Sequence, residues 1–179
     1  MHAPTPHDPT RRRLLGRAVS PERGASPPRP PWTRSEAVLG ERCTGCGDCI
    51  RVCPERVLLA GRGGLPILDT RAGGCTLCGR CADACPEPIF DRASGRRPFP
   101  FVLAPSVRCL EVEGVTCRAC VDACDVRALR PRLQPGGRAR IEVDPRLCTG
   151  CGACESVCPV GALERVVAGE PDTAEEVKR

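Results

Sequence analysis

The sequence predicts a small α+β protein made of two tandem modules behind a flexible N-terminal tail. Three observations lead to this prediction. Sets of cysteines recur in pairs at an interval of about 30 residues, which indicates an internal repeat. Short apolar runs around glycines follow the cysteine sets, as in β-hairpins. The first 38 residues are rich in Pro and Arg and show no apolar periodicity, which is typical of a flexible segment.

We expect four segments along the chain. They are a flexible tail (1–38), a first module (39–92), a second module (106–168) and a C-terminal tail (169–179). The module boundary is placed in "DRASGRRPFPFVLAPS", residues 91–106, because Gly, Pro and Arg break any pattern there. Each module should contain one β-hairpin, at 56–69 and at 128–144. Short helical turns are expected at the third and fourth cysteine of each set.

Composition limits the kind of core that the chain can build. The 179 residues include 16 Cys but only three Phe, one Trp and no Tyr. An apolar core would be thin, and chains of this kind usually depend on disulfides or metal. Two histidines, His2 and His7, lie in the tail, and we assign them no metal role.

The cellular compartment determines whether the cysteines form disulfides or bind metal. Arg11 and Arg12 resemble a twin-arginine export signal, but "GRAVSPER" (16–23) follows them instead of the required apolar stretch. No window approaches the roughly 18 apolar residues of a membrane span. We therefore expect a cytoplasmic protein whose thiols serve as metal ligands.

The basic charge does not by itself indicate nucleic-acid binding. The chain has 27 Lys and Arg against 22 Asp and Glu. The arginines are scattered and no aromatic residues are interleaved with them, so we interpret them as solvated surface and expect no nucleic-acid partner.

Three complete copies of one cysteine motif carry the chemistry. They are "CTGCGDCIRVCP" (43–54), "CTLCGRCADACP" (75–86) and "CTGCGACESVCP" (148–159). In C-x2-C-x2-C-x3-C-P the first three thiolates hold one [4Fe-4S] cluster and the fourth ligates the other cluster of the pair. Glycines between the ligands permit positive φ and a close approach of backbone N–H groups to the sulfurs: Gly45, Gly47, Gly79, Gly150 and Gly152.

Zinc is the alternative, since paired C-x2-C units also form zinc ribbons and knuckles. Zinc ribbons separate their two hooks by a longer loop, and three complete sets favour iron–sulfur clusters. We expect four [4Fe-4S] clusters, and at least three. With crossed ligation the sixteen cysteines form these sets: Cys43, Cys46, Cys49 and Cys85; Cys75, Cys78, Cys81 and Cys53; Cys148, Cys151, Cys154 and Cys124; Cys109, Cys117, Cys120 and Cys158.

The third copy, "CLEVEGVTCRACVDAC" (109–124), departs from the others. Its first gap holds seven residues instead of two, and Asp125 replaces the usual Pro, yet no cysteine is missing. We predict that the seven residues form a loop over one cluster, with Gly114 at its turn. Such a loop would change solvent access and hydrogen bonding, and with them the reduction potential.

These features resemble the ferredoxin-type NapF proteins of periplasmic nitrate reductase systems. The likeness rests on the order of the four sets, on "CLEVEGVTCRAC", on "RPPW" (29–32) and on the Arg-Arg start. It implies bacterial-type ferredoxin-like modules. It also implies a cytoplasmic accessory protein that acts on the precursor of the NapA-type catalytic subunit before export, helping to load or reduce its cluster.

Other functions stay open at this point. An electron-transfer ferredoxin, or a wiring subunit of an oxidoreductase complex, would need the same clusters. Catalysis on a small molecule would need an acid, a base or an open metal position, and no spare cysteine or placed histidine is present, so we do not expect an enzyme. Trp32 is expected either to cover the first cluster or to anchor a partner, and the tail either to bind a partner or to stay solvated.

Overall fold

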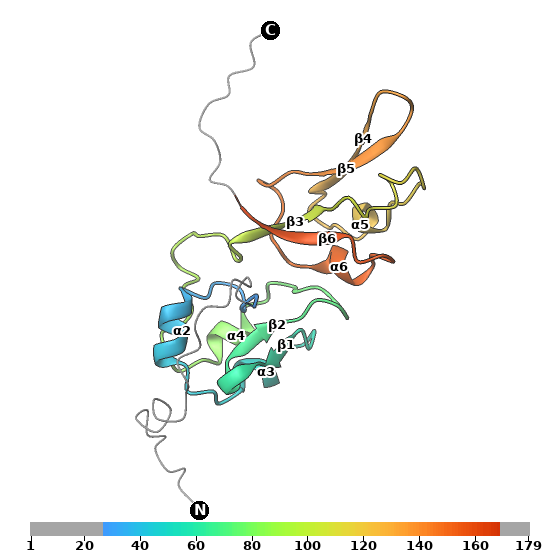
Figure 1. Ribbon diagram of the computed structural model, residues 1–179. Helices are drawn as coiled ribbons and strands as arrows, with labels where there is room; N and C mark the ends of the chain where they lie inside the picture. The colour runs from blue at the N-terminus through green and yellow to red at the C-terminus, as the bar shows by residue number, and fades with distance from the viewer. Residues whose placement is uncertain (1–26, 169–179) are drawn as a thin grey trace, which may run out of the picture.

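The computed structural model describes residues 27–168, and the tail segments 1–26 and 169–179 lie outside the described residues. The α+β class and the tandem arrangement are confirmed (Figure 1). The first module, with α2, α3, α4, β1 and β2, lies at one end of the view, and the second, with β3 to β6, α5 and α6, lies at the other. No helix of residues 27–168 is long and apolar enough to cross a membrane.

The first module contains the predicted hairpin. The two strands pair antiparallel, with Leu58 opposite Leu68, and both of these side chains are buried. Gly63 and Gly64 have positive φ in the turn between the strands. The elements are, in order, α2 (Glu36–Arg42), α3 (Asp48–Arg51), β1 (Leu58–Ala60), η1 (Arg62–Gly64), β2 (Pro66–Leu68) and α4 (Arg80–Asp83).

The N-terminal tail is shorter than we expected. We predicted a flexible segment through residue 38, but residues 27–38 pack against the folded part of the chain. Pro30 and Pro31 are fully buried. The Pro28 carbonyl accepts a 2.8 Å hydrogen bond from the N–H of Leu68. The Pro-rich composition was misleading because these prolines fill apolar surface left open by the first module.

Helix α2 was also missed. The Ser35 hydroxyl caps it by accepting a hydrogen bond from the N–H of Val38 at 3.2 Å. Glu36 in its first turn and Arg42 in its last turn complement the helix dipole. Leu39 is its one buried residue, and a single buried position gives no periodic signal in the sequence.

The second module contains the other predicted hairpin and one further strand pair. Leu129 lies opposite Val143 in the hairpin, and Ile141 on the same hairpin is buried. The elements are β3 (Phe101–Pro105), α5 (Ala119–Asp122), β4 (Leu129–Leu133), β5 (Ala139–Val143), α6 (Ala153–Ser156) and β6 (Leu163–Val167).

Strand β3 lies where we placed the module boundary. It pairs antiparallel with β6 along its full length, with Phe101 opposite Val167, so the second module begins before residue 106. Phe99 and Phe101 are buried with ring centroids 5.2 Å apart. The prolines of this segment suggested a break, but β3 pairs with one strand only, and an edge strand tolerates Pro105 at its end.

The short helices hold the third cysteine of each set, as predicted. Our expectation for the fourth cysteines was wrong, because each helical turn ends before them; α3 ends at Arg51 and Cys53 follows it. The buried third cysteines lie in one apolar cluster with residues of both modules, so ligands and core share the same interior. These cysteines are Cys49, Cys81, Cys120 and Cys154.

Candidate iron–sulfur centres

The cysteines gather around separate pockets. The first pocket lies under α2 and the residues that follow the second cysteine set. Leu39, Ile89 and Phe90 supply its apolar cover. Its cysteines are Cys43, Cys46, Cys49 and Cys85. The first three come from one set and the fourth from the next, which is the grouping that crossed ligation predicts.

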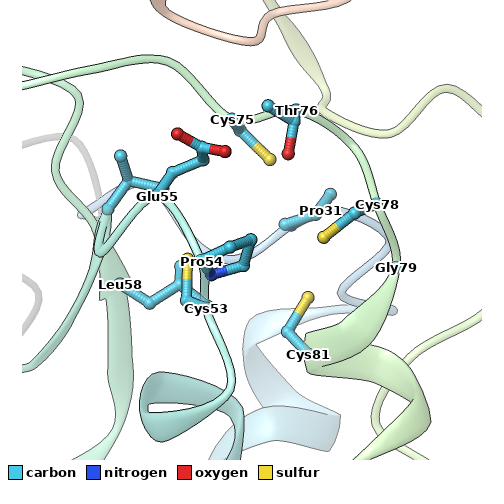
Figure 2. Close-up of a pocket in the computed structure, with 11 residues that line it drawn as sticks. Pro31, Cys53, Pro54, Glu55, Leu58, Cys75, Thr76, Cys78, Gly79 and Cys81 are labelled. Atoms are coloured by element: carbon cyan, nitrogen blue, oxygen red, sulfur yellow. The ribbon is translucent and has the colours of Figure 1, made fainter.

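The second pocket joins the other cysteines of the first module. Figure 2 shows the sulfurs of four cysteines facing a common space, one from the end of the first set and three from the second. Pro31, Val57 and Leu58 line the same space. These cysteines are Cys53, Cys75, Cys78 and Cys81.

A third pocket belongs to the set with the long gap. Leu110, from the loop, and Val160 and Leu163, from the C-terminal side, line it. Its cysteines are Cys109, Cys117, Cys120 and Cys158. The first three cysteines of the irregular set are therefore brought together in spite of the seven-residue gap.

The remaining set contains Cys148, Cys151 and Cys154. The first two lie close enough to Cys154 that their charges help to raise its pKa. Cys124 is the predicted fourth ligand, and its sulfur accepts a 3.2 Å hydrogen bond from the N–H of Ala128. The sulfur of Cys158 accepts a matching 3.2 Å bond from Ala162. N–H donors of this kind stabilise negative charge on a ligand sulfur.

The protonation of these thiols depends on what they bind. Burial raises the pKa of Cys81 and Cys154 to about 12, and neighbouring cysteine charges add to the effect. Burial likewise raises the pKa of Cys49 and Cys75 to about 11. Without a cation the buried thiols keep their protons at neutral pH, so binding of iron must release those protons.

The donor set fits [4Fe-4S] clusters. Three pockets have four thiols and apolar walls each, and a cluster takes one thiolate at each of its four iron corners. Residues 27–168 contain no group of three or more His, Cys, Asp or Glu side chains placed to hold a single metal ion. The assignment of individual cysteines to individual clusters stays a prediction.

Comparison with known proteins agrees with this donor set. A family model described as "4Fe-4S dicluster domain" matches residues 42–89 and 115–162. The ferredoxin-type protein NapF of Haemophilus influenzae is 44% identical over 135 residues, which cover 75% of this chain and 76% of the relative. The NapF protein of Escherichia coli strain K12 is 35% identical over 136 residues, covering 75% of this chain and 82% of the relative.

The chain belongs to the NapF family of ferredoxin-type proteins. It is accordingly an iron–sulfur protein with [4Fe-4S] clusters and not an enzyme. A more distant similarity links it to one component of the proton-translocating ferredoxin:NAD(+) oxidoreductase complex of Clostridium ljungdahlii. That relative is 31% identical over 134 residues, which cover 71% of this chain and 45% of the relative.

In this NapF-type chain the long gap forms the predicted loop, with Gly114 at φ +85. Glu111 within the loop is only 5% exposed. Its Oε2 accepts a 2.6 Å hydrogen bond from the N–H of Cys117. Sequence reasoning missed Glu111, because an acidic residue between apolar residues in a loop is usually solvated.

The regular sets follow the predicted backbone pattern at the residue before each helical turn. Gly47, Gly79 and Gly152 all have φ between +77 and +81 there. Arg118 occupies the same place in the irregular set and has φ −124. The irregular set therefore presents its N–H groups differently around its pocket, as well as carrying the longer loop.

Trp32 does not cover the first pocket, contrary to one of our two expectations. It is half-buried, and its backbone N–H donates a 2.7 Å hydrogen bond to the Pro98 carbonyl. The guanidinium of Arg92 lies 5.3 Å from its ring centroid. Its neighbour Pro31 lines the second pocket instead. Trp32 has φ +60, and Pro31, which precedes it, is buried.

Proposed function

We propose that this protein is a cytoplasmic accessory factor that helps to load or reduce the iron–sulfur cluster of a periplasmic nitrate reductase catalytic subunit before export. The partner would be the precursor of that NapA-type subunit. The similarity to NapF proteins over three quarters of the chain carries the proposal. The irregular third cysteine set supports it, because this set is a more specific point of resemblance to NapF proteins than the regular sets are.

We further propose four [4Fe-4S] clusters, each held by the crossed ligand sets predicted above. The pocket groupings support three of these sets directly. When bound, each cluster accepts or donates one electron at a time. The chain contributes thiolate ligands, apolar walls that limit water, and N–H donors to sulfur, which together set the reduction potential.

The proposal is tested in a strain that lacks the protein. The catalytic subunit is purified from that strain, and its iron and molybdenum contents are measured together with its activity with an artificial electron donor. We expect low iron content and low donor-driven activity. A tagged copy of the protein should retain the precursor and little of the mature exported form. Normal iron content with full donor-driven activity would refute the maturation role.

An electron-transfer role is the second candidate. The similarity to a component of a ferredoxin:NAD(+) oxidoreductase complex supports it. In this case the catalytic subunit from the deletion strain would carry all of its cofactors and respond fully to an artificial donor. Only reduction by the physiological donor would fail. The same measurements therefore separate the two candidates.

A further inference from the structure

The two modules meet through their cluster-binding loops. The N–H of Cys75 donates a 2.8 Å hydrogen bond to the carbonyl of Cys151. Cys75 lines the second pocket of the first module, whereas Cys151 belongs to the last cysteine set in the second module. The charge of Cys151 also contributes to the raised pKa of Cys75, as expected for two sulfurs that lie close together.

Next to this hydrogen bond, the modules are held by three side chains that we call the inter-module clamp: Thr70, Glu155 and Arg165. The Thr70 hydroxyl donates to Oε2 of Glu155. Nη2 of Arg165 donates to the Thr70 hydroxyl at 2.8 Å and to the same Glu155 oxygen at 2.6 Å. Thr70 follows β2 in the first module, while Glu155 lies on α6 and Arg165 on β6 in the second.

The clamp is partly shielded from water. Thr70 is 1% exposed, and the side chains of Glu155 and Arg165 are 17% and 28% exposed. Arg165 also lies 5.5 Å above the ring of Phe101. Charged hydrogen bonds that are partly removed from water are stronger and more directional than those on an open surface. This geometry holds the modules in one relative position.

Close packing supports the same conclusion. A Cβ on Gly74 would lie 2.7–2.9 Å from the backbone and Cβ of Ala153, which is closer than real Cβ atoms approach. A Cβ on Gly152 would overlap the side chain of Thr70. The interface therefore has no room for a methyl group at either position. Gly73, the neighbour of Gly74, has only an ordinary contact with Val57, at 4.0 Å.

We infer that the inter-module clamp positions the Cys75 and Cys151 loops so that the two modules form one continuous electron-transfer unit. The ligands that meet at the Cys75–Cys151 junction belong to different modules. An electron crossing the junction oxidises one centre by one electron and reduces the other by one, with no proton transfer. Because electron transfer weakens steeply with distance, the protein's contribution is to hold the centres close together.

This inference requires bound clusters but not the maturation role, so the two can fail separately. It assigns Thr70, Glu155 and Arg165 as positioning residues, which act on the centres only through the relative placement of two ligand loops. The structure also predicts that the relative position of the two modules changes when a methyl group is added at Gly74 and does not change when one is added at Gly73.

The test uses the full iron-loaded chain, purified anaerobically, and compares Gly74→Ala with Gly73→Ala. In the fully reduced protein, the magnetic interaction between clusters is measured by low-temperature EPR. Magnetic interactions within each module should be the same in both variants. A difference between their EPR spectra therefore measures the interaction across the Cys75–Cys151 junction. We expect Gly73→Ala to match the wild type and Gly74→Ala to show weaker interaction. Hydrogen exchange at the Cys75 amide should be roughly tenfold faster in Gly74→Ala.

Arg165→Met provides a second variant that removes the clamp without adding atoms at the junction. This variant tests the inference even if Gly74→Ala fails to bind iron. It should weaken the magnetic interaction with full iron content, and Arg165→Lys should restore part of it. Identical EPR spectra and identical Cys75 exchange rates for the wild type and the clamp variants would overturn the inference.

Discussion

The carboxylate of Glu111 accepts a 2.6 Å hydrogen bond from the backbone nitrogen of Cys117, inside a loop that buries it to 5% exposure. Cys117 is one of four cysteines around the third pocket. Among the acidic side chains of residues 27–168, Glu111 is the most deeply buried, and it lies beside this pocket. Its negative charge and its use of a ligand N–H both disfavour further negative charge in that pocket. We therefore interpret the irregular set as a modified ligand set that has kept all of its cysteines.

Replacing Glu111 by Gln should raise the reduction potential of one cluster. The amide oxygen of Gln can keep the hydrogen bond to Cys117, but the negative charge is lost, so the reduced cluster becomes easier to form. We expect a shift of roughly tens of millivolts at this centre and none at the others. A redox titration followed by EPR measures it. Glu113→Gln, on the exposed side of the same loop, is the matched control. An unchanged set of potentials in Glu111→Gln would contradict this account.

Replacing Cys53 by Ser should damage the cluster of the second set more than that of its own set. Cys53 lines the pocket of Cys75, Cys78 and Cys81 and not that of Cys43. Iron content and Mössbauer or EPR spectra of the purified variant measure the loss. Cys85→Ser is the reciprocal variant, and it should affect the first pocket instead. Spectral loss confined to the Cys43 cluster in Cys53→Ser would show that ligation does not cross in this module.

The intact protein should contain about 16 iron atoms and an equal amount of acid-labile sulfide, because each of four clusters has four of each. Removing the iron should also unfold much of the chain, since the buried cysteines belong to the same apolar cluster as the core. Metal analysis and far-ultraviolet circular dichroism before and after chelation under oxidising conditions measure both effects. One or two zinc atoms per chain, with no visible absorption, would end the iron–sulfur assignment.

Replacing Phe99 by Ala should destabilise the second module by about 3–5 kcal/mol. Phe99 is 1% exposed and packs against Phe101, so the substitution leaves a cavity beside β3. Denaturant unfolding of the iron-loaded protein under anaerobic conditions measures the change. Val107→Ala, at a side chain that is 80% exposed, should change stability by less than about 0.5 kcal/mol. Equal effects of the two substitutions would show that Phe99 is not a core residue in solution.

Features that depend on neighbouring residues could be predicted from the sequence. The cysteine pattern predicted which thiols share a pocket in three of the four sets. In the two regular sets, two-residue gaps bring three sulfurs together in one short loop, and in all three pockets the fourth cysteine comes from the paired set, as crossed ligation predicts. The two hairpins could be predicted from glycines between apolar runs. The predicted tail boundary and module boundary were wrong, because both rested on Pro and Arg content. Both segments nevertheless bury side chains against the modules, as Pro31 and Phe99 show.

By itself, the sequence determined the donor chemistry, the repeated modules and the family, since these depend on residue type and local spacing. The tertiary structure alone decided how the modules join. Thr70 and Glu155 stand 85 residues apart, and Thr70 and Arg165 stand 95 apart. The sequence holds no local signal for such pairs, because their contact depends on which surfaces pack together after each module has formed. The Cys75–Cys151 hydrogen bond is of the same kind, and it places the ligand loops of the two modules side by side.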